Sequence, residues 1–425
     1  MTMTSSSEWL AQSRDGLRDQ LLVTLWLIVT FKQFPNDELL LYPLALYFSW
    51  AFVRDLPLLF PLIKRAWVLF LFPIWLFLSV SWGVETETIL KNAAQLLLTI
   101  MICFYASLRL SRRQIMLAMV IAGAIFAVLS FLAPLSGGLA QRGVFSSKNA
   151  MGSAMVILLV SALCVVLDKG FPRMIRLGAA AAALLAFNLI FVAHSATAVI
   201  LSAGAIMAIF LFGILPTGGR LRSPVFWVIT LAGTAITLSF MATILAFEEV
   251  NPVEQVLAIF DKDTTLTGRT TLWAYATEQI RLHPYLGVGD GGFWTPQDWT
   301  SDARRIYEEF HKKYHAHFSF HNSYFEIAVH QGLIGLGIAV LAVSWSLFQV
   351  IRAVLVYNAI PTVFFFTISS VTMVRSMTEA GLMAPFSQLP MLLTIGALLA
   401  LRDRLSEAPR RAPLPVFRPR TVAAE

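Results

Sequence analysis

Long runs of apolar residues recur along almost the whole chain, and they constrain its fold more than any other feature. A helix that crosses a bilayer needs about 20 mostly apolar residues. Twelve runs are candidates: residues 20–34, 38–53, 66–82, 89–108, 114–132, 149–167, 174–193, 195–214, 224–246, 323–351, 354–374 and 383–401. The pattern therefore predicts an all-α, polytopic membrane protein with about 12 transmembrane helices.

The composition excludes the main alternatives to a membrane protein. The 425 residues are 57% hydrophobic and 13% charged, with a mean hydropathy of +0.71. A single buried core stops growing at about 250–300 residues, so this excess does not fit one large soluble domain. A soluble enzyme, a disordered chain and a coiled coil are excluded. The net charge of +7 comes from scattered basic residues, which does not favour nucleic-acid binding.

The basic residues predict how the chain is oriented. Lysine and arginine are enriched in cytoplasmic loops. If the N-terminus is cytoplasmic, the inner segments hold 20 of the 32 basic residues and the short outer segments hold 5, and the remaining 7 lie in one long outer segment. We therefore predict that both termini are cytoplasmic and that the long segment lies on the outer side of the membrane.

These limits divide the chain into four parts. Residues 1–246 form an N-terminal membrane bundle of about nine spans, and residues 247–322 form a large outer loop between spans 9 and 10. Residues 323–401 form a C-terminal bundle of about three spans, and residues 402–425 form a cytoplasmic tail rich in Arg and Pro. Loops of this length tend to be functional, and this one carries five of the seven histidines.

Two residues of the long loop are the strongest catalytic candidates. Arg269 and Trp273 are four residues apart on an expected helix and would share a face. The arginine is either an ordinary helix-start residue or a guanidinium directed at phosphate, to which its planar fork is suited. His321 lies where the loop re-enters the membrane, either as a plain interfacial residue or as a base, because histidine changes protonation near neutral pH.

Two patterns in the loop allow other interpretations. Gly287-x-Gly289 resembles part of a dinucleotide-binding fingerprint, but the flanking strand and helix are missing, so we expect a turn whose backbone approaches a ligand closely. His315, His317 and His321 could bind zinc, but no further ligand is nearby in sequence. We expect neither a metal nor a cofactor. Gly332 and Gly335 are expected to form a ridge on a spanning helix that allows close packing.

Other polar residues are expected on the same outer side of the membrane. Ionisable groups at membrane depth are costly enough to be functional candidates by default. The additional substrate-binding candidates are Arg142, Lys148, Asn149, Asn322, Glu326 and Arg375. Arg375 and Glu379 are four residues apart and could instead pair with each other, and Glu326 could orient His321 or bind sugar.

Three motifs, taken in order, resemble those of the O-antigen ligase and Wzy-type polymerase superfamily of bacterial envelope proteins. The first is Gly143-x-Phe145-x3-Asn149, and the second is Gly268-Arg269-x3-Trp273 followed by His283-Pro284-x2-Gly287-x-Gly289. The third, His321-Asn322-x9-Gly332-x2-Gly335, matches the ligase signature at every fixed position. The motifs cover residues 140 to 340.

The resemblance implies a glycosyltransferase of the bacterial inner membrane that works without a metal and inverts the anomeric centre. Residues 247–322 would then form a periplasmic loop. Its donor would be an undecaprenyl-diphosphate-linked glycan, with His321 activating the acceptor hydroxyl and Arg269 contacting the diphosphate. Ligases commonly carry a further arginine after a serine of the eighth span, and His194-Ser195-Ala196-Thr197 lacks it. The chain in this respect looks more like the ExoQ-type exopolysaccharide polymerases, with Arg142 or Arg375 as a candidate replacement.

The leading hypothesis is a polymerase of lipid-linked repeat units, acting in the bilayer with a flippase and a chain-length regulator as possible partners. A ligase that passes the glycan to lipid A core or to a protein uses the same chemistry. A transporter is the alternative from another class, but the polar groups expected inside the spans, such as Asn92, Asn188 and Glu326, are too scattered to line a path.

Overall fold

The computed structural model describes residues 14–32, 34–134, 141–214, 268–314, 318–357 and 359–407. Within these ranges every regular element is a helix and there is no strand. The predicted all-α class is confirmed. The predicted span at residues 224–246, the first part of the long loop and most of the C-terminal tail lie outside the described residues.

Six described helices are long and apolar enough to cross a membrane. They are α5 (Thr86–Arg109), α6 (Arg112–Leu132), α7 (Lys148–Leu167), α8 (Arg173–Val192), α9 (Ala196–Ile209) with its π-helical extension η3 (Phe210–Ile214), and α14 (Ser323–Tyr357). A seventh candidate is the pair α2 (Glu38–Arg54) and α3 (Leu56–Arg65), which is bent by 87°. The protein is therefore a membrane protein, and the total of twelve spans stays a prediction.

The other apolar runs within the described ranges are also helical. They form α1 (Arg14–Phe31), the short series η1 (Trp67–Phe70), α4 (Leu71–Leu78) and η2 (Ser79–Ser81), α15 (Ile360–Ser376) and α16 (Gln388–Glu407). α15 starts later than its apolar run because it has a proline at N2, and proline is favoured in the first turn of a helix rather than in its interior. The apolar runs thus predicted the approximate positions of these helices, but the first residues of the run 354–374 belong to the end of α14.

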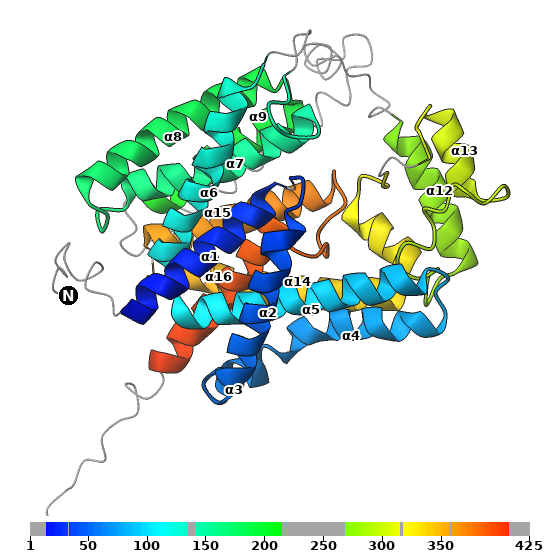
Figure 1. The fold of residues 1–425 in the computed structure, drawn as a ribbon, viewed down its shortest axis with the longest axis horizontal. Helices are drawn as coiled ribbons and strands as arrows, with labels where there is room; N and C mark the ends of the chain where they lie inside the picture. The colour runs from blue at the N-terminus through cyan, green and yellow to red at the C-terminus, as the bar shows by residue number, and fades with distance from the viewer. Residues whose placement is uncertain are drawn as a thin grey trace, which may run out of the picture.

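The helices pack into one bundle with α7 deep inside it. This helix packs against α6, α8 and α9, and most of its residues are buried, as expected of a helix that is apolar on every side. In Figure 1, α7, α8 and α9 lie together on one side of the bundle. The large rings of Trp26, Phe48 and Tyr105 are fully buried between α1, α2 and α5.

Ion pairs tie together the segments that were assigned to the cytoplasmic side. Arginines at the adjoining ends of α5 and α6 reach carboxylates of four other segments. The pairs are Arg109 with Asp19 and Asp55, Arg112 with Asp403, and Arg113 with Asp168. These segments are far apart in sequence but meet at one end of the bundle, which supports their placement on a common side.

Two short helices form a separate layer at the other end. α12 (Arg269–Leu282) and α13 (Asp302–Glu309) lie beside the start of α14 (Figure 1). They enclose a small apolar core that includes Leu272, Phe293 and Ile306. This layer is part of the predicted long loop, residues 247–322. It keeps Arg269 and His321, the two strongest catalytic candidates, close to the bundle.

Candidate functional site

The start of α14 presents His321 in a constrained backbone conformation. His321 has a φ of +48°, which is uncommon for a residue other than glycine. Next to it, Asn322 caps α14, because its side-chain oxygen accepts hydrogen bonds from the backbone N–H groups of Tyr324 (2.9 Å) and Phe325 (3.3 Å). Strained backbone of this kind is concentrated at functional sites. His321 is thus held in place by its neighbour Asn322, which caps α14.

Glu379 holds the imidazole of His321 on its Nδ1 side. The distance from His321 Nδ1 to Glu379 Oε2 is 3.0 Å. An ionised carboxylate only accepts hydrogen bonds, so Nδ1 carries the proton and the lone pair is left on Nε2. That arrangement makes Nε2 a proton acceptor. The other carboxylate oxygen of Glu379 lies 3.5 Å from a guanidinium nitrogen of Arg269. Glu379 therefore bridges the two predicted catalytic residues.

The charge on Glu379 is stabilised by its surroundings. Burial opposes ionisation of this carboxyl group, but the hydrogen bond from His321 and the nearby positive charges of Arg375 and Arg269 together outweigh the effect of burial. The result is a pKa of Glu379 below its usual range. The carboxylate is consequently ionised at neutral pH, as its role toward His321 requires.

The spacing of Arg269 and Trp273 has a structural reason. Gly268, in the left-handed region at a φ of +80°, precedes α12, so Arg269 is its first residue. One turn later the indole N–H of Trp273 donates to the backbone carbonyl of Phe320 (3.0 Å). The Trp273 ring also stacks on Phe325. One face of α12 is thereby fixed to the residue before His321, which places Arg269 beside Glu379.

Glu326 forms no hydrogen bond with the ring of His321, which it could have oriented, and its possible role in binding sugar stays a prediction. Its two oxygens accept hydrogen bonds from the indole of Trp294 (2.8 Å) and the backbone N–H of Phe320 (2.9 Å). Glu326 is five residues beyond His321, whereas side chains share a helix face at three or four. It therefore supports the loop before His321 through the backbone of Phe320.

Gly332 interrupts α14, so the expected helical glycine ridge is wrong at this position. Its φ of +67° and ψ of −178° are not helical. A Cβ atom here would lie 2.0 Å from the carbonyl oxygen of Tyr285. The carbonyls of Val329 and His330 accept from the N–H groups of Val288 and Gly289. The backbone of the Gly287-x-Gly289 turn thus comes close to a neighbour, as expected, and the neighbour that it contacts is α14.

A cationic cavity of about 600 Å³ lies near this centre. It is lined by Lys32, Arg142 and Arg375, without an acidic side chain among its described lining residues. Arg375 also lines a small pocket together with Glu379 and Ser323. Arg142 and Arg375 are far apart in sequence and meet at this cavity. Arg375 and Glu379 do not form an ion pair within 4 Å, although they are four residues apart.

Asn149 and Lys148 lie at the start of α7, next to the cationic cavity. Ser147 caps this helix. The side-chain oxygen of Asn149 accepts a hydrogen bond from Ser195 (3.0 Å), which joins α7 to the stretch that lacks the ligase arginine. Asn149 thus has a structural role that sequence analysis did not foresee, and the substrate-binding roles of Lys148 and Asn149 stay predictions.

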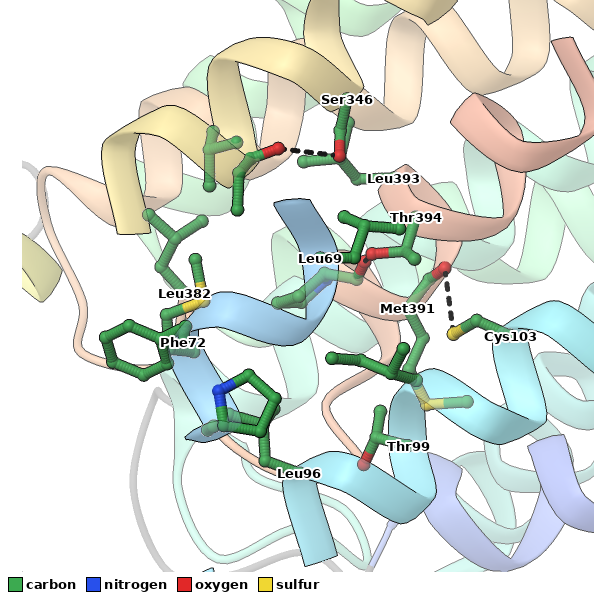
Figure 2. A pocket seen from close by; sticks show the side chains of 17 residues that line it. Leu69, Phe72, Leu96, Thr99, Cys103, Ser346, Leu382, Met391, Leu393 and Thr394 are labelled. Atoms are coloured by element: carbon green, nitrogen blue, oxygen red, sulfur yellow. Dashed lines mark hydrogen bonds between the residues drawn. The ribbon is translucent and has the colours of Figure 1, made fainter. Parts of the chain in front are cut away.

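Two further pockets adjoin the site. A chamber of about 1040 Å³, called here the acidic chamber, is lined by carboxylates that include Glu85, Asp290 and Glu326. Figure 2 shows a smaller apolar pocket of about 60 Å³ between α4, α5, α14 and α16. Side chains such as Phe72, Leu96 and Met391 line it, without a charged group among the described lining residues. The charged side chains near the site therefore line the neighbouring cavities and not this apolar pocket.

Some sequence-predicted features remain untested. His315 and His317 lie outside the described residues, and in the part of the chain that is described no three His, Cys, Asp or Glu side chains gather as a metal site would require. Sequence reasoning missed the contact of Glu379 with His321. The only available signal was its four-residue spacing from Arg375, which pointed to a different partner.

Comparisons with known proteins agree with the motifs. Residues 180–341 match the Wzy_C family model, described as O-antigen ligase. This range includes Arg269, His321 and Glu326, and excludes Arg142 and Arg375. The chain is also 27% identical over 332 residues to the exopolysaccharide production protein ExoQ of Rhizobium meliloti, with 75% of this chain and 73% of that protein covered. The chain is therefore similar to O-antigen ligase in its central segment and to an exopolysaccharide production protein along most of its length, which confirms the resemblance that its motifs indicate.

Proposed function

We propose that this protein polymerises lipid-linked oligosaccharide repeat units into an exopolysaccharide or surface polysaccharide. It transfers a growing glycan from undecaprenyl diphosphate to the next lipid-linked unit, at the outer face of a bacterial inner membrane. The observation that carries the proposal is the His321–Glu379 pair, 3.0 Å apart, with Arg269 on the same carboxylate. A base beside cations is what transfer from a diphosphate leaving group requires.

In the proposed reaction, His321 Nε2 removes the proton of the acceptor hydroxyl. The hydroxyl oxygen attacks the anomeric carbon of the donor sugar, and the bond from that carbon to the diphosphate oxygen breaks with its electron pair on the diphosphate. The new bond forms on the opposite face of the sugar, so the configuration inverts. Glu379 stabilises the imidazolium that results. The proton then leaves to solvent and restores the base.

Cationic side chains would bind the departing diphosphate. Arg269 lies beside the catalytic pair, and the cationic cavity presents Arg142 and Arg375. Among the described residues neither Arg142 nor Arg375 forms an ion pair with a carboxylate, so both guanidinium groups are available to phosphate oxygens. They are our candidates for the charge that the sequence lacks near Ser195. The lipid diphosphate already activates the sugar, so the scheme needs neither metal nor nucleotide.

The ion-paired end of the bundle supports the proposed orientation. It gathers the segments assigned to the cytoplasm, and the candidate site lies at the other end, with the layer of α12 and α13. We infer that both termini are cytoplasmic and that residues 247–322 form a periplasmic part between the two membrane bundles. A flippase would supply the repeat units, and a chain-length regulator would act on the product.

A ligase is the second candidate, because the matching family model is described as O-antigen ligase. The chemistry at the donor is the same, and only the acceptor differs. A ligase would pass a finished glycan to lipid A core or to a protein hydroxyl. The similarity to an exopolysaccharide production protein favours the polymerase.

The test compares glycans from cells that carry His321→Ala or Arg269→Ala. His283→Ala and Arg281→Ala are matched controls, because both side chains are exposed in the same layer. With equal protein levels, we expect the first two variants to lose long polymer and to accumulate single lipid-linked repeats, and the controls to retain it. Normal polymer in the first two variants would refute the catalytic assignment. Long chains that remain on the lipid carrier would identify a ligase.

A further inference from the structure

The acidic chamber and the cationic cavity adjoin each other and have opposite charge. The chamber is lined by five carboxylates and one lysine, namely Asp37, Glu38, Glu85, Asp290, Glu326 and Lys91. The cationic cavity has three basic side chains and no acidic one among its described lining residues. Thr30 and Ser387 line both. A diphosphate is attracted to one compartment and repelled by the other.

A recess that shares residues with the chamber holds polar groups that lack hydrogen-bond partners within the described ranges. A recess of about 260 Å³ shares Asn92, Asp290 and Glu326 with the chamber and adds Gln331. Gln331 is only 2% exposed, and neither atom of its amide has a hydrogen-bond partner among the described residues. Buried polar groups are nearly always satisfied in native proteins. An unsatisfied amide in the wall of a recess indicates a ligand that both donates and accepts hydrogen bonds.

His330 supplies a second such group. It is 5% exposed, and its Nδ1 accepts a hydrogen bond from the backbone N–H of Gly291 (2.9 Å). The proton of the neutral ring is therefore on Nε2, which lies 3.5 Å from Glu326 and has no hydrogen-bond partner in the described part of the chain. His330 is thus a donor in the wall of the recess. It differs from His321, whose Nε2 is the acceptor.

The mixture of groups favours a sugar over a cation. Gln331 and His330 bring N–H donors without partners among the described residues, which repel a metal ion, next to the carboxylates of Asp290 and Glu326. Asn92 already donates to Asp290 (2.6 Å). Sugar hydroxyls donate and accept, and they suit this combination. The aromatic rings of Trp294, Tyr307 and Phe318 line the chamber and pack edge-to-face against one another. Rigid ring faces provide apolar contact area for the carbon faces of a pyranose.

We propose that the acidic chamber is a subsite for uncharged sugar residues of the glycan, and that its carboxylates exclude the diphosphate. This inference rests on the proposed function and specifies its substrate. The glycan of a bound substrate lies in the chamber and its diphosphate in the cationic cavity. The two compartments thereby fix the direction of the substrate, and sugars that carry a carboxylate are disfavoured at this subsite.

The test measures oligosaccharide binding to the purified full-length protein in lipid nanodiscs by isothermal calorimetry. The probes are three uncharged tetrasaccharides (maltotetraose, cellotetraose and laminaritetraose) and tetragalacturonate of equal length. We expect at least one uncharged probe to bind at least tenfold more tightly than tetragalacturonate. Absence of binding by every uncharged probe, or equal binding of the acidic one, would overturn the proposal.

Two variants locate the binding within the chamber. Gln331→Leu removes both unsatisfied polar atoms and keeps a similar side-chain volume. It should weaken binding of the uncharged probe at least tenfold. Glu38→Gln with Glu85→Gln removes two charges at the chamber wall and should strengthen tetragalacturonate binding at least threefold. If neither variant changes binding of these probes, the sugar is bound elsewhere and the proposal is wrong.

Binding of undecaprenyl diphosphate separates this inference from the proposed function. We expect Gln331→Leu to leave it within twofold of the unaltered protein, whereas Arg375→Ala should reduce it. If oligosaccharide binds as expected but undecaprenyl diphosphate does not bind at all, the proposed donor is wrong and the sugar subsite stands. If the lipid binds and the oligosaccharides do not, the subsite is wrong and the donor assignment stands.

Discussion

At the scale of single residues, two histidines nine positions apart differ in chemistry because of their neighbours. His321 faces a carboxylate through Nδ1, so its Nε2 is a base, whereas His330 accepts an N–H through Nδ1, so its Nε2 is a donor. The sequence shows two similar residues. Their roles depend on Glu379, 58 residues after His321, and on Gly291, 39 residues before His330, and no local pattern predicts such distant contacts.

We expect Glu379→Gln to abolish most activity without preventing substrate binding. The glutamine amide can donate to His321 Nδ1, which transfers the ring proton to Nε2 and removes the base. The expected result is a fall in kcat of about 10²–10⁴-fold with KM changed less than threefold. The measurement is polymer formation from purified lipid-linked repeats. Glu278→Gln, at an exposed position of α12, is the control and should retain activity. A rise in KM with kcat preserved would contradict the positioning role.

The lowered pKa of Glu379 predicts a pH-dependent contribution to stability. A carboxyl group whose pKa is lower in the folded state stabilises the protein above its unfolded pKa, about 4.3 for glutamate, and loses this effect as pH falls through the folded value. The Tm difference between the native protein and Glu379→Gln should be constant from pH 7 to 5 and shrink toward pH 3. Thermal unfolding in detergent measures it. A difference that grows as the pH falls would mean that burial, not pairing, dominates.

At the scale of elements, the break in α14 is the feature that assembles the site. A helix interrupted at membrane depth must satisfy the freed backbone groups from elsewhere. Here the segment after α12 does so, since the N–H groups of Leu333 and Ile334 donate to the carbonyls of Pro284 and Tyr285. The sequence predicted a continuous span with a glycine ridge, because glycine within an apolar run is equally compatible with packing and with a break. The segment after α12, which binds the freed backbone groups of α14, shows that the glycine at 332 marks a break.

Gly332→Ala should destabilise the protein, and Gly337→Ala should not. The alanine at 332 needs a φ near +67° and places its Cβ against the carbonyl of Tyr285, whereas a methyl group added at Gly337 would meet no atom within 4 Å and lies on regular helix. We expect a cost of about 3 kcal/mol or more at 332 and a neutral or slightly favourable effect at 337. Thermal unfolding and polymer yield should fall together at 332 alone. Equal Tm values for the two variants would refute the docking role of Gly332.

At the scale of the whole molecule, the sequence predicted the helices better than the site. Apolar length is a local property, so runs such as residues 114–132 and 149–167 coincide with α6 and α7. The meeting of Arg142 with Arg375, and of Arg269 with Glu379, depends on how helices pack and is visible only in three dimensions. The charge count contained some of this information, because the segments that it assigned to one side are joined by ion pairs.

Cysteine labelling tests the sidedness of the molecule directly. The native thiols of Cys103 and Cys164 are buried, so single added cysteines can be labelled without removing them. Trp299→Cys lies in the layer with α12 and α13, where Trp299 is 82% exposed, and Lys169→Cys lies between α7 and α8 next to the ion-paired Asp168. In intact spheroplasts a membrane-impermeant maleimide should label position 299 and not 169. Both should be labelled after lysis, which shows that each thiol is accessible. The reverse pattern in intact spheroplasts would place the candidate site on the cytoplasmic side. A substrate that has already been flipped across the membrane could not reach it there. The proposed polymerisation at the outer face would then be wrong.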